Sequence, residues 1–427
     1  MTANNSKVKP ASLFKRPAII DNIYKPEEKV GRFLFVLVLF GISFGMKQGV
    51  QNNYLSDILH VDPSERGVID AFRELPGLLL IFILAIMYRF SDSKVFKFGT
   101  ALMAGGMAGI FLTSSSGIFL IKILVVVFMV IFSAGEHIIM PVRSTIAMEL
   151  AKHERTGSSL GITTSITQLG TITGLILVTL IFILLERFGY SRIDLTGYRI
   201  IFGLATGLMI AAFLVAAALK ETTLKAPRQR LYFAKKFTKY YIMEVFYGSR
   251  KQIFLTFGPY VLVHEYNANA STMSMLLAIC AVFVMVCSPL IGRLIDKVGY
   301  KAVMVGDTLL LVFVCLMYGF AHRWFPAVAF IVVCCNFVLD QIISTASMAN
   351  NVYVQRISKN REEVTATLST GISVNHIFSV LIALIGGWIW GTAGIETLFT
   401  ISAILGLISS IYAATIKKSE ELQGGNF

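Results

Sequence analysis

The chain has 427 residues, of which 55% are hydrophobic and only 15% are charged, and its formal net charge is +13. Soluble proteins contain roughly a quarter charged residues, so the composition excludes an ordinary soluble globular protein. The basic residues lie in short segments between long apolar runs rather than in one basic patch, and we therefore expect no nucleic-acid partner.

Apolar stretches of about 20 residues, the length that a helix needs to cross a bilayer, recur along the whole chain. They lack the alternating pattern of a membrane β-strand, so the sequence predicts an all-α membrane protein. The twelve predicted transmembrane helices cover residues 32–52, 68–89, 97–113, 117–140, 159–185, 198–219, 239–264, 272–292, 301–320, 324–348, 364–391 and 395–416.

Lysine and arginine concentrate in every second connection and in both terminal segments. Because basic connections stay on the cytoplasmic side, we expect a multi-pass protein of the cytoplasmic (inner) membrane with both termini in the cytoplasm. Anionic membrane lipids are expected neighbours of this charge. The predicted organisation is a cytoplasmic tail (1–31), a six-helix half (32–219), a basic cytoplasmic linker (220–238), a second six-helix half (239–416) and a cytoplasmic tail (417–427).

Polar side chains interrupt the apolar runs of the first half. The first span contains Lys47 and Gln48, and the fourth contains Glu136 and His137 near its middle. The second span holds Arg73-Glu74-Leu75-Pro76-Gly77, where proline and glycine favour a bend. We interpret its two charges as a local structural pair, with an external gate as the alternative.

The second half repeats this pattern at a constant offset. Lysine–glutamine pairs occur in the first and seventh spans, and acidic residues occur in the fourth and tenth. The later members of these pairs are Lys251, Gln252 and Asp340. Arg250 and His376 are further polar residues within predicted spans. A charge that faces lipid near the bilayer centre is costly, so we expect these side chains to face an aqueous cavity or one another.

Two connections also match at the same offset. Arg89 and Asp92 correspond to Arg293 and Asp296. The second connection, Gly292–Lys301, reads G-x-x-x-D-K-x-G-x-K, and its two glycines favour a sharp turn directly after the eighth span. The chain therefore consists of two pseudo-symmetric halves.

Twelve spans in two halves, a basic central linker and the Gly292–Lys301 motif resemble a transporter of the major facilitator superfamily. The first connection departs from the family pattern, with Tyr88 and Val95 in place of glycines. The resemblance implies a monomer that works by alternating access, with helices 1, 4, 7 and 10 around a central cavity. It also implies a gating role for Arg89, Asp92, Gly292, Arg293, Asp296, Gly299 and Lys301.

Cationic side chains from both halves suggest an anion site, because lysine and arginine bind carboxylate or phosphate strongly. The predicted substrate-binding residues are Lys47, Gln48, Arg250, Lys251, Gln252 and His376. The predicted proton-coupling residues are Glu136, His137 and Asp340, because a carboxylate in such a cavity can exchange a proton when a neighbouring lysine binds substrate. The alternative is that the lysines pair permanently with Glu136 and Asp340 and only hold helices together.

The sequence thus predicts a secondary active transporter for a small polar solute, anionic or zwitterionic, coupled to protons. An exporter of amphipathic drugs or lipids is one alternative, and a transport-dead receptor or scaffold is another. The chain shows no phosphate-binding glycine loop, nucleophile motif or metal-ligand spacing, so we expect no enzymatic activity, no cofactor and no metal site.

Overall fold

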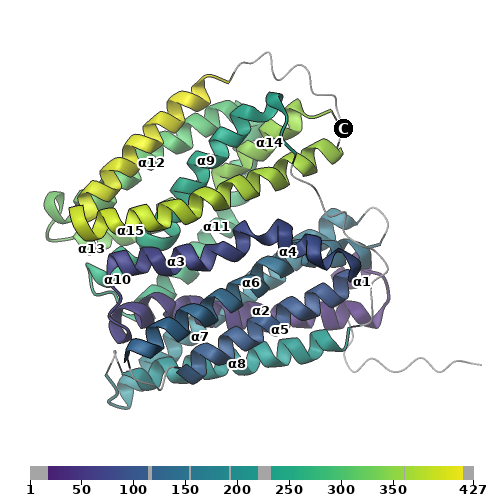
Figure 1. Cartoon of the computed structure of the whole chain (residues 1–427), viewed down its shortest axis with the longest axis horizontal. Coiled ribbons are helices and arrows are strands. Elements are labelled where there is room, and N and C mark those ends of the chain that lie inside the picture. Colours follow the sequence, from purple (N-terminus) through teal and green to yellow (C-terminus); the bar gives the residue numbers. More distant parts are fainter. Residues whose placement is uncertain are drawn as a thin grey trace, which may run out of the picture.

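The computed structural model describes residues 18–113, 118–152, 155–191, 194–219, 232–359 and 361–416. These residues form helices and helical turns, with a single isolated bridge between Tyr24 and Ala151. Figure 1 shows two helical bundles packed side by side, the first half below and the second half above. Residues 1–17, much of the linker (220–231) and the tail at 417–427 lie outside the described residues.

The first half is an antiparallel bundle around one continuous apolar core. Its helices are α1 (Ala18–Ile23), α2 (Glu28–Asn53), α3 (Pro63–Leu78), α4 (Leu80–Ile86), α5 (Asp92–Thr113), α6 (Ile118–Leu150), α7 (Thr156–Arg187) and α8 (Leu195–Ala217), with short turns η1 (Tyr54–Ile58) and η2 (Met87–Arg89). The start of α3 is set by a capping box, in which Asp62 accepts from the amide of Glu65 at 2.8 Å.

The second half contains two apolar cores, one toward each end of its bundle. Its helices are α9 (Thr238–Gln252), α10 (Gly258–His264), α11 (Ala270–Val298), α12 (Tyr300–Trp324), α13 (Ala329–Ser344), α14 (Met348–Ile357) and α15 (Arg361–Ala414), with turns η3 (Lys235–Phe237), η4 (Ile253–Phe257) and η5 (Thr345–Ser347).

The twelve predicted spans are present, although several are divided or joined. Nine of the described helical stretches are each long and apolar enough to cross a membrane. The second span is divided into α3 and α4 just after Pro76 and Gly77, and the seventh is interrupted by the π-helical turn η4. The last two spans are joined in α15, which bends at Gly394, where φ is +83°. The all-α prediction is confirmed.

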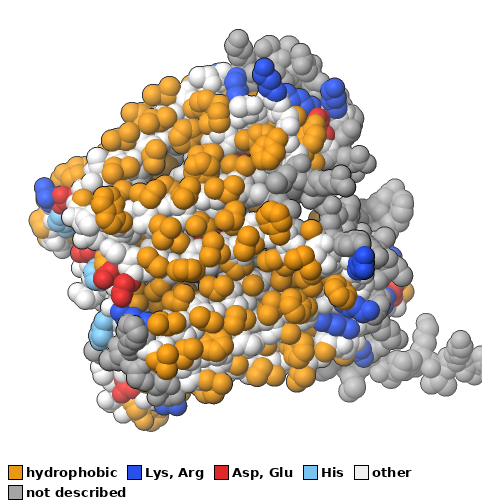
Figure 2. All heavy atoms as spheres, viewed as in Figure 1, with side chains coloured by type: hydrophobic (Ala, Val, Ile, Leu, Met, Phe, Trp, Pro, Cys, Tyr) orange, Lys and Arg blue, Asp and Glu red, His pale blue; other side chains and the backbone are white. Residues whose placement is uncertain are grey.

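The surface of the bundles is apolar over most of their length. Figure 2 shows one face covered with hydrophobic side chains, with charged side chains gathered toward the two ends of the helices. Large apolar side chains such as Ile86, Leu112 and Ile411 are exposed. Such a belt suits the hydrocarbon layer of a membrane.

Part of the predicted N-terminal tail is folded. Helix α1 leads into Tyr24, which is buried and whose hydroxyl donates to the carbonyl oxygen of Ser159 at 3.0 Å. The Lys25 amide donates to the Leu150 carbonyl at 3.0 Å. This segment therefore packs against the connection between α6 and α7.

The two halves are tightly packed at the end that the topology predicts to be external. Helices α3 and α15 run beside each other there (Figure 1). A Cβ atom on Gly67 would overlap the carbonyl oxygen of Ala383 and lie 2.9 Å from the Cα of Gly387. Ser64 donates a hydrogen bond to the Gly387 carbonyl at 3.2 Å, and Asn53 of α2 donates to a carbonyl just before α11 at 2.7 Å. Small residues allow this close approach of the two backbones.

The connection between α11 and α12 is shorter than the sequence predicted. Gly292 does not turn the chain, because α11 continues through it to Val298. The single turn residue is Gly299, with φ of +87°, a conformation that residues with a side chain rarely adopt. The intervening residues 293–298, of which all but Ile295 are exposed, continue the helix instead of forming a loop, because no proline or glycine interrupts them before Gly299.

Gly299→Ala is expected to destabilise the protein by about 1–3 kcal/mol, because φ of +87° with ψ of 152° is a backbone conformation that almost only glycine adopts without strain. Gly292→Ala is the matched control: this glycine is helical and has open space around its Cβ position, so alanine is expected to be neutral or slightly stabilising. Thermal denaturation in detergent measures both. Equal destabilisation by the two substitutions would show that the turn begins at Gly292 after all.

Candidate functional site

One side of α3 carries four charged side chains, Arg66, Asp70, Arg73 and Glu74. Arg66 and Asp70 form an ion pair at 2.9 Å, and Arg73 pairs with Asp70 at 3.1 Å and with Glu74 at 2.9 Å. Arg66, Asp70 and Glu74 are buried. The row is therefore a self-compensating ionic network buried inside the protein, as a buried charge requires.

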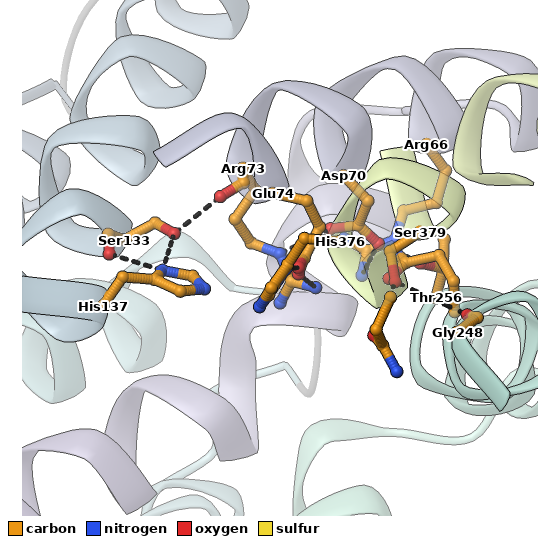
Figure 3. A network of polar contacts seen from close by, with 12 residues as sticks. Arg66, Asp70, Arg73, Glu74, Ser133, His137, Gly248, Thr256, His376 and Ser379 are labelled. Carbon is orange, nitrogen blue, oxygen red and sulfur yellow. Dashed lines mark hydrogen bonds and ion pairs between the residues drawn. The ribbon is translucent and has the colours of Figure 1, made fainter. Parts of the chain in front are cut away.

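Glu74 connects this network to the other half. Its Oε2 lies 3.1 Å from Nδ1 of His376 on α15. The His376 ring packs edge-on against His137 of α6, with 5.1 Å between the ring centroids. His137 is held by Ser133, whose carbonyl oxygen lies 2.8 Å from its Nδ1. Figure 3 shows Glu74 and His376 in the middle of the network, with His137 on one side.

The predicted local pair of Arg73 and Glu74 is confirmed by their 2.9 Å ion pair. The second contact of Glu74 could not be predicted, because His376 lies far away in the sequence. Gly77, one turn after Arg73, leaves room for both histidines. A Cβ atom there would lie 2.7 Å from His137 Nε2 and 2.7 Å from His376 Nδ1.

The two predicted site lysines lie near this network without an ion-pair partner among the described residues. Lys47 on α2 is buried, and its Nζ lies 4.3 Å from the centroid of the Phe132 ring. Glu136 attracts Lys47 electrostatically, but no ion pair joins them. Lys251 on α9 is half-buried and acts electrostatically on Glu74 across the boundary between the halves. The structure thus brings Lys47, Glu136 and Lys251 to one region.

Arg250 is placed elsewhere, although it precedes Lys251 directly. Successive residues of a helix point about 100° apart. The Arg250 guanidinium lies 3.3 Å from Asp307 on α12 and 3.4 Å from Asp340 on α13. Arg250 and Asp307 also line a cavity of about 40 Å³, which has room for water. The three charges form a compact group within the second half.

Glu244 is a buried carboxylate that was not among the predicted site residues. It accepts hydrogen bonds from Asn350 at 3.3 Å and from Asn375 at 3.4 Å. Lys251 acts on it electrostatically. Its position seven residues before Lys251, on the same face of α9, was the signal that could have identified it.

The remaining predicted substrate residues lie on the same two helices. Gln48 is half-buried on α2, and the Gln252 amide donates to the Thr256 hydroxyl at 2.6 Å. The predicted gating residues lie at helix ends that the sequence predicts to be cytoplasmic. Asp92 is buried at the start of α5, and Lys301 donates to the Ile416 carbonyl at 2.7 Å. Arg89 ends η2, and Arg293 and Asp296 are exposed on the last turns of α11.

Comparison with known families decides the identity of this fold. Residues 33–239 and residues 240–426 each match the family model described as Major Facilitator Superfamily. The chain belongs to the major facilitator superfamily. It is therefore a multi-pass membrane transporter, and the double match agrees with the internal repeat seen in the sequence. No curated protein matches this superfamily member in sequence.

Solved structures of other superfamily transporters have the same fold. A D-xylose–proton symporter matches with a TM-score of 0.72 at 12% identity, covering 92% of this chain and 99% of that chain. The nucleoside transporter NupG matches with 0.69 at 13%, covering 92% and 100%. A POT family transporter in complex with 5-aminolevulinic acid matches with 0.71 at 11%, covering 91% and 96%. At these identities the likeness shows the fold alone.

Proposed function

We propose that this superfamily member is a secondary active transporter that moves a small polar organic solute, anionic or zwitterionic, across the cytoplasmic membrane by alternating access. The observation that carries the proposal is the pair of lysines, one from each half, that no described carboxylate neutralises through an ion pair. A buried ammonium group without a counter-ion is costly, which favours a role in binding an anionic group. Lys47 and Lys251 would bind this group, with Gln48, Gln252 and His376 as hydrogen-bonding neighbours.

The solved transporters of this fold support the size and polarity of the proposed solute. They include a nucleoside transporter, a D-xylose–proton symporter and a POT family transporter in complex with 5-aminolevulinic acid. The last compound carries both an amine and a carboxylate, as the proposed zwitterion does. The proposed partners are the solute, protons and membrane lipids, and the proposed working unit is the monomer.

Coupling to protons is the second part of the proposal, and we assign it to Asp340. Asp307 and Asp340 share the single cation Arg250, so one proton would neutralise this buried group of three charges. A group with an odd charge inside a membrane protein favours uptake of that proton. Other titratable side chains that interact with Asp340 are Tyr247, Cys280, Cys315 and Tyr318. The proton roles predicted for Glu136 and His137 remain predictions.

A thermal-shift screen of the purified full chain against carboxylates, phosphorylated compounds, organic cations and lipids tests the solute class. A ligand that binds the native state raises the melting temperature. We expect acids or phosphorylated compounds to stabilise the protein. Lys47→Ala is expected to weaken their binding by about 10- to 150-fold, because a hydrogen bond to a charged group contributes about 1.5–3 kcal/mol.

Lys122→Ala is the matched control for this experiment. Lys122 lies near the N-terminal end of α6 and forms an ion pair with Glu65 at 2.8 Å. Because it is not among the proposed solute-binding residues, its loss is expected to leave ligand binding unchanged. An unchanged melting shift in Lys47→Ala would contradict the anion site. Stabilisation by hydrophobic cations or lipids alone would favour the exporter of amphipathic compounds instead.

A further inference from the structure

Three side chains with metal-binding atoms converge at the boundary between the halves. Glu74 from α3, His137 from α6 and His376 from α15 each place one such atom so that all three atoms lie within 4.8 Å of one another. All three side chains are buried. Two imidazoles and one carboxylate suit divalent first-row transition metals and leave coordination positions open.

The hydrogen bonds of His137 leave its inward-facing nitrogen free to bind. Nδ1 lies 2.8 Å from the carbonyl oxygen of Ser133, which can only accept, so the neutral ring carries its proton on Nδ1. Nε2 is then an unprotonated acceptor, on the side of the ring that faces the rest of the network in Figure 3. A bond from the other ring nitrogen to a carbonyl is how proteins orient metal-binding histidines.

Gly77 keeps the space beside these nitrogens open. The point where its Cβ would lie is 2.7 Å from His137 Nε2 and 2.7 Å from His376 Nδ1. The two nitrogens therefore border one common volume next to the backbone of α3, which any larger residue at this position would fill.

The ion pair of Arg73 leaves one oxygen of Glu74 available. Arg73 contacts Oε1 at 2.9 Å, whereas His376 faces Oε2 at 3.1 Å. Arg73 also pairs with Asp70 at 3.1 Å, so the guanidinium keeps a partner when Glu74 takes another. The carboxylate can thus serve the arginine and a metal ion through different oxygens.

We propose that Glu74, His137 and His376 bind one divalent transition-metal ion between the two halves. The site goes beyond the proposed solute transport: it shares His376 with the proposed solute site but uses neither of that site's lysines. The ion takes the place of the hydrogen-bonded proton between His376 and Glu74, and that proton passes to water. Because the ligands come from both halves, a bound ion holds the halves in the arrangement seen in Figure 1 and slows their alternation.

Co²⁺ is the probe, because its visible absorption reports the ligands directly. The full-length protein, without a histidine tag, is titrated with Co²⁺ in detergent. We expect an absorption band that saturates at one Co²⁺ per chain, and a rise in Kd of at least about tenfold in Glu74→Gln, His137→Ala and His376→Ala. His322→Ala is the matched control, because His322 also faces a carboxylate, Glu396 at 2.9 Å, but at an exposed site.

Two further variants separate metal binding from misfolding and from solute binding. Gly77→Ala keeps all three ligands but places a methyl group between the nitrogens, so it is expected to abolish the Co²⁺ band. Lys251→Ala removes a cation that acts on Glu74 and His376, so it is expected to tighten Co²⁺ binding while weakening binding of an acidic solute. These opposite signs distinguish the two sites.

The metal site is overturned if Co²⁺ gives no saturable band, or if its Kd is unchanged in His137→Ala and His376→Ala proteins that melt as the wild type does. Solute binding is measured separately in chelator-treated protein. Retained solute binding with no Co²⁺ binding would leave the proposed transport function in place, and the converse would leave the metal site in place.

Discussion

Asp340→Asn is expected to abolish proton-driven accumulation of the solute while leaving its exchange across the membrane intact. Asparagine has nearly the same shape and can still accept a hydrogen bond from Arg250, but it cannot bind and release the proton. Only the charges of Arg250 and Asp307 would remain in the group, and because these two charges cancel, the group would stay neutral at every pH of the experiment. Uptake into proteoliposomes with and without a pH gradient measures accumulation, and counterflow measures exchange.

Asp307→Asn is the comparison for this prediction. Asp307 shares the same arginine but its side chain is 13% exposed and borders the cavity, whereas that of Asp340 is 3% exposed. Asp307→Asn leaves Arg250 and Asp340 as an ion pair without net charge, which no longer favours uptake of a proton, so accumulation is expected to be reduced in this variant as well. If Asp340→Asn protein still concentrates the solute against its gradient, another group carries the coupling proton.

The architecture of this protein could be predicted because it depends on properties that are local in the sequence. Each span can be recognised in the sequence as a long apolar run, since lipid requires every backbone group to be paired within the helix. The repeat could be recognised because rare charges inside the spans recur at one offset. The connection after α11 could not be predicted correctly, because a charged segment such as Arg293–Val298 is compatible with either a loop or a helical extension.

The candidate site was only partly predictable, because helix packing decides which side chains meet. Lys47 and Lys251 could be selected as candidates, since a lysine inside an apolar run is conspicuous. The direction in which Arg250 points could not be predicted, because its two carboxylate partners come from α12 and α13. The contact between Glu74 and His376 joins residues from different halves, and no sequence spacing encodes it.

The proposed metal ligands could not be recognised from their spacing in the sequence for the same reason. Spacing rules detect ligands that share one helix or loop. Glu74, His137 and His376 lie on three helices, so only the packing of the two halves brings them together. The bend after Gly77, visible in the sequence as Pro76-Gly77, was the one local signal of this region.

Gly67→Ala is expected to reduce transport by about fivefold or more, because it prevents the halves from closing at the end predicted to be external. The new Cβ atom would overlap the Ala383 carbonyl oxygen, and Gly387 lies too close for α15 to move inward. Overpacking of this kind costs about 1–3 kcal/mol, which shifts a two-state equilibrium by about 5- to 150-fold. The shift favours the state in which α3 and α15 are apart.

Labelling of a reporter cysteine measures this shift directly. Ser64→Cys, in a background without the native cysteines, places a thiol where α3 contacts α15. We expect a membrane-impermeant thiol reagent to label it faster when Gly67 is replaced by alanine. Gly105→Ala is the control, because its Cβ position faces open space and alanine there is expected to change neither labelling nor transport. Slow labelling together with normal transport in Gly67→Ala would mean that this contact does not open during the transport cycle, and that the halves alternate about a different boundary.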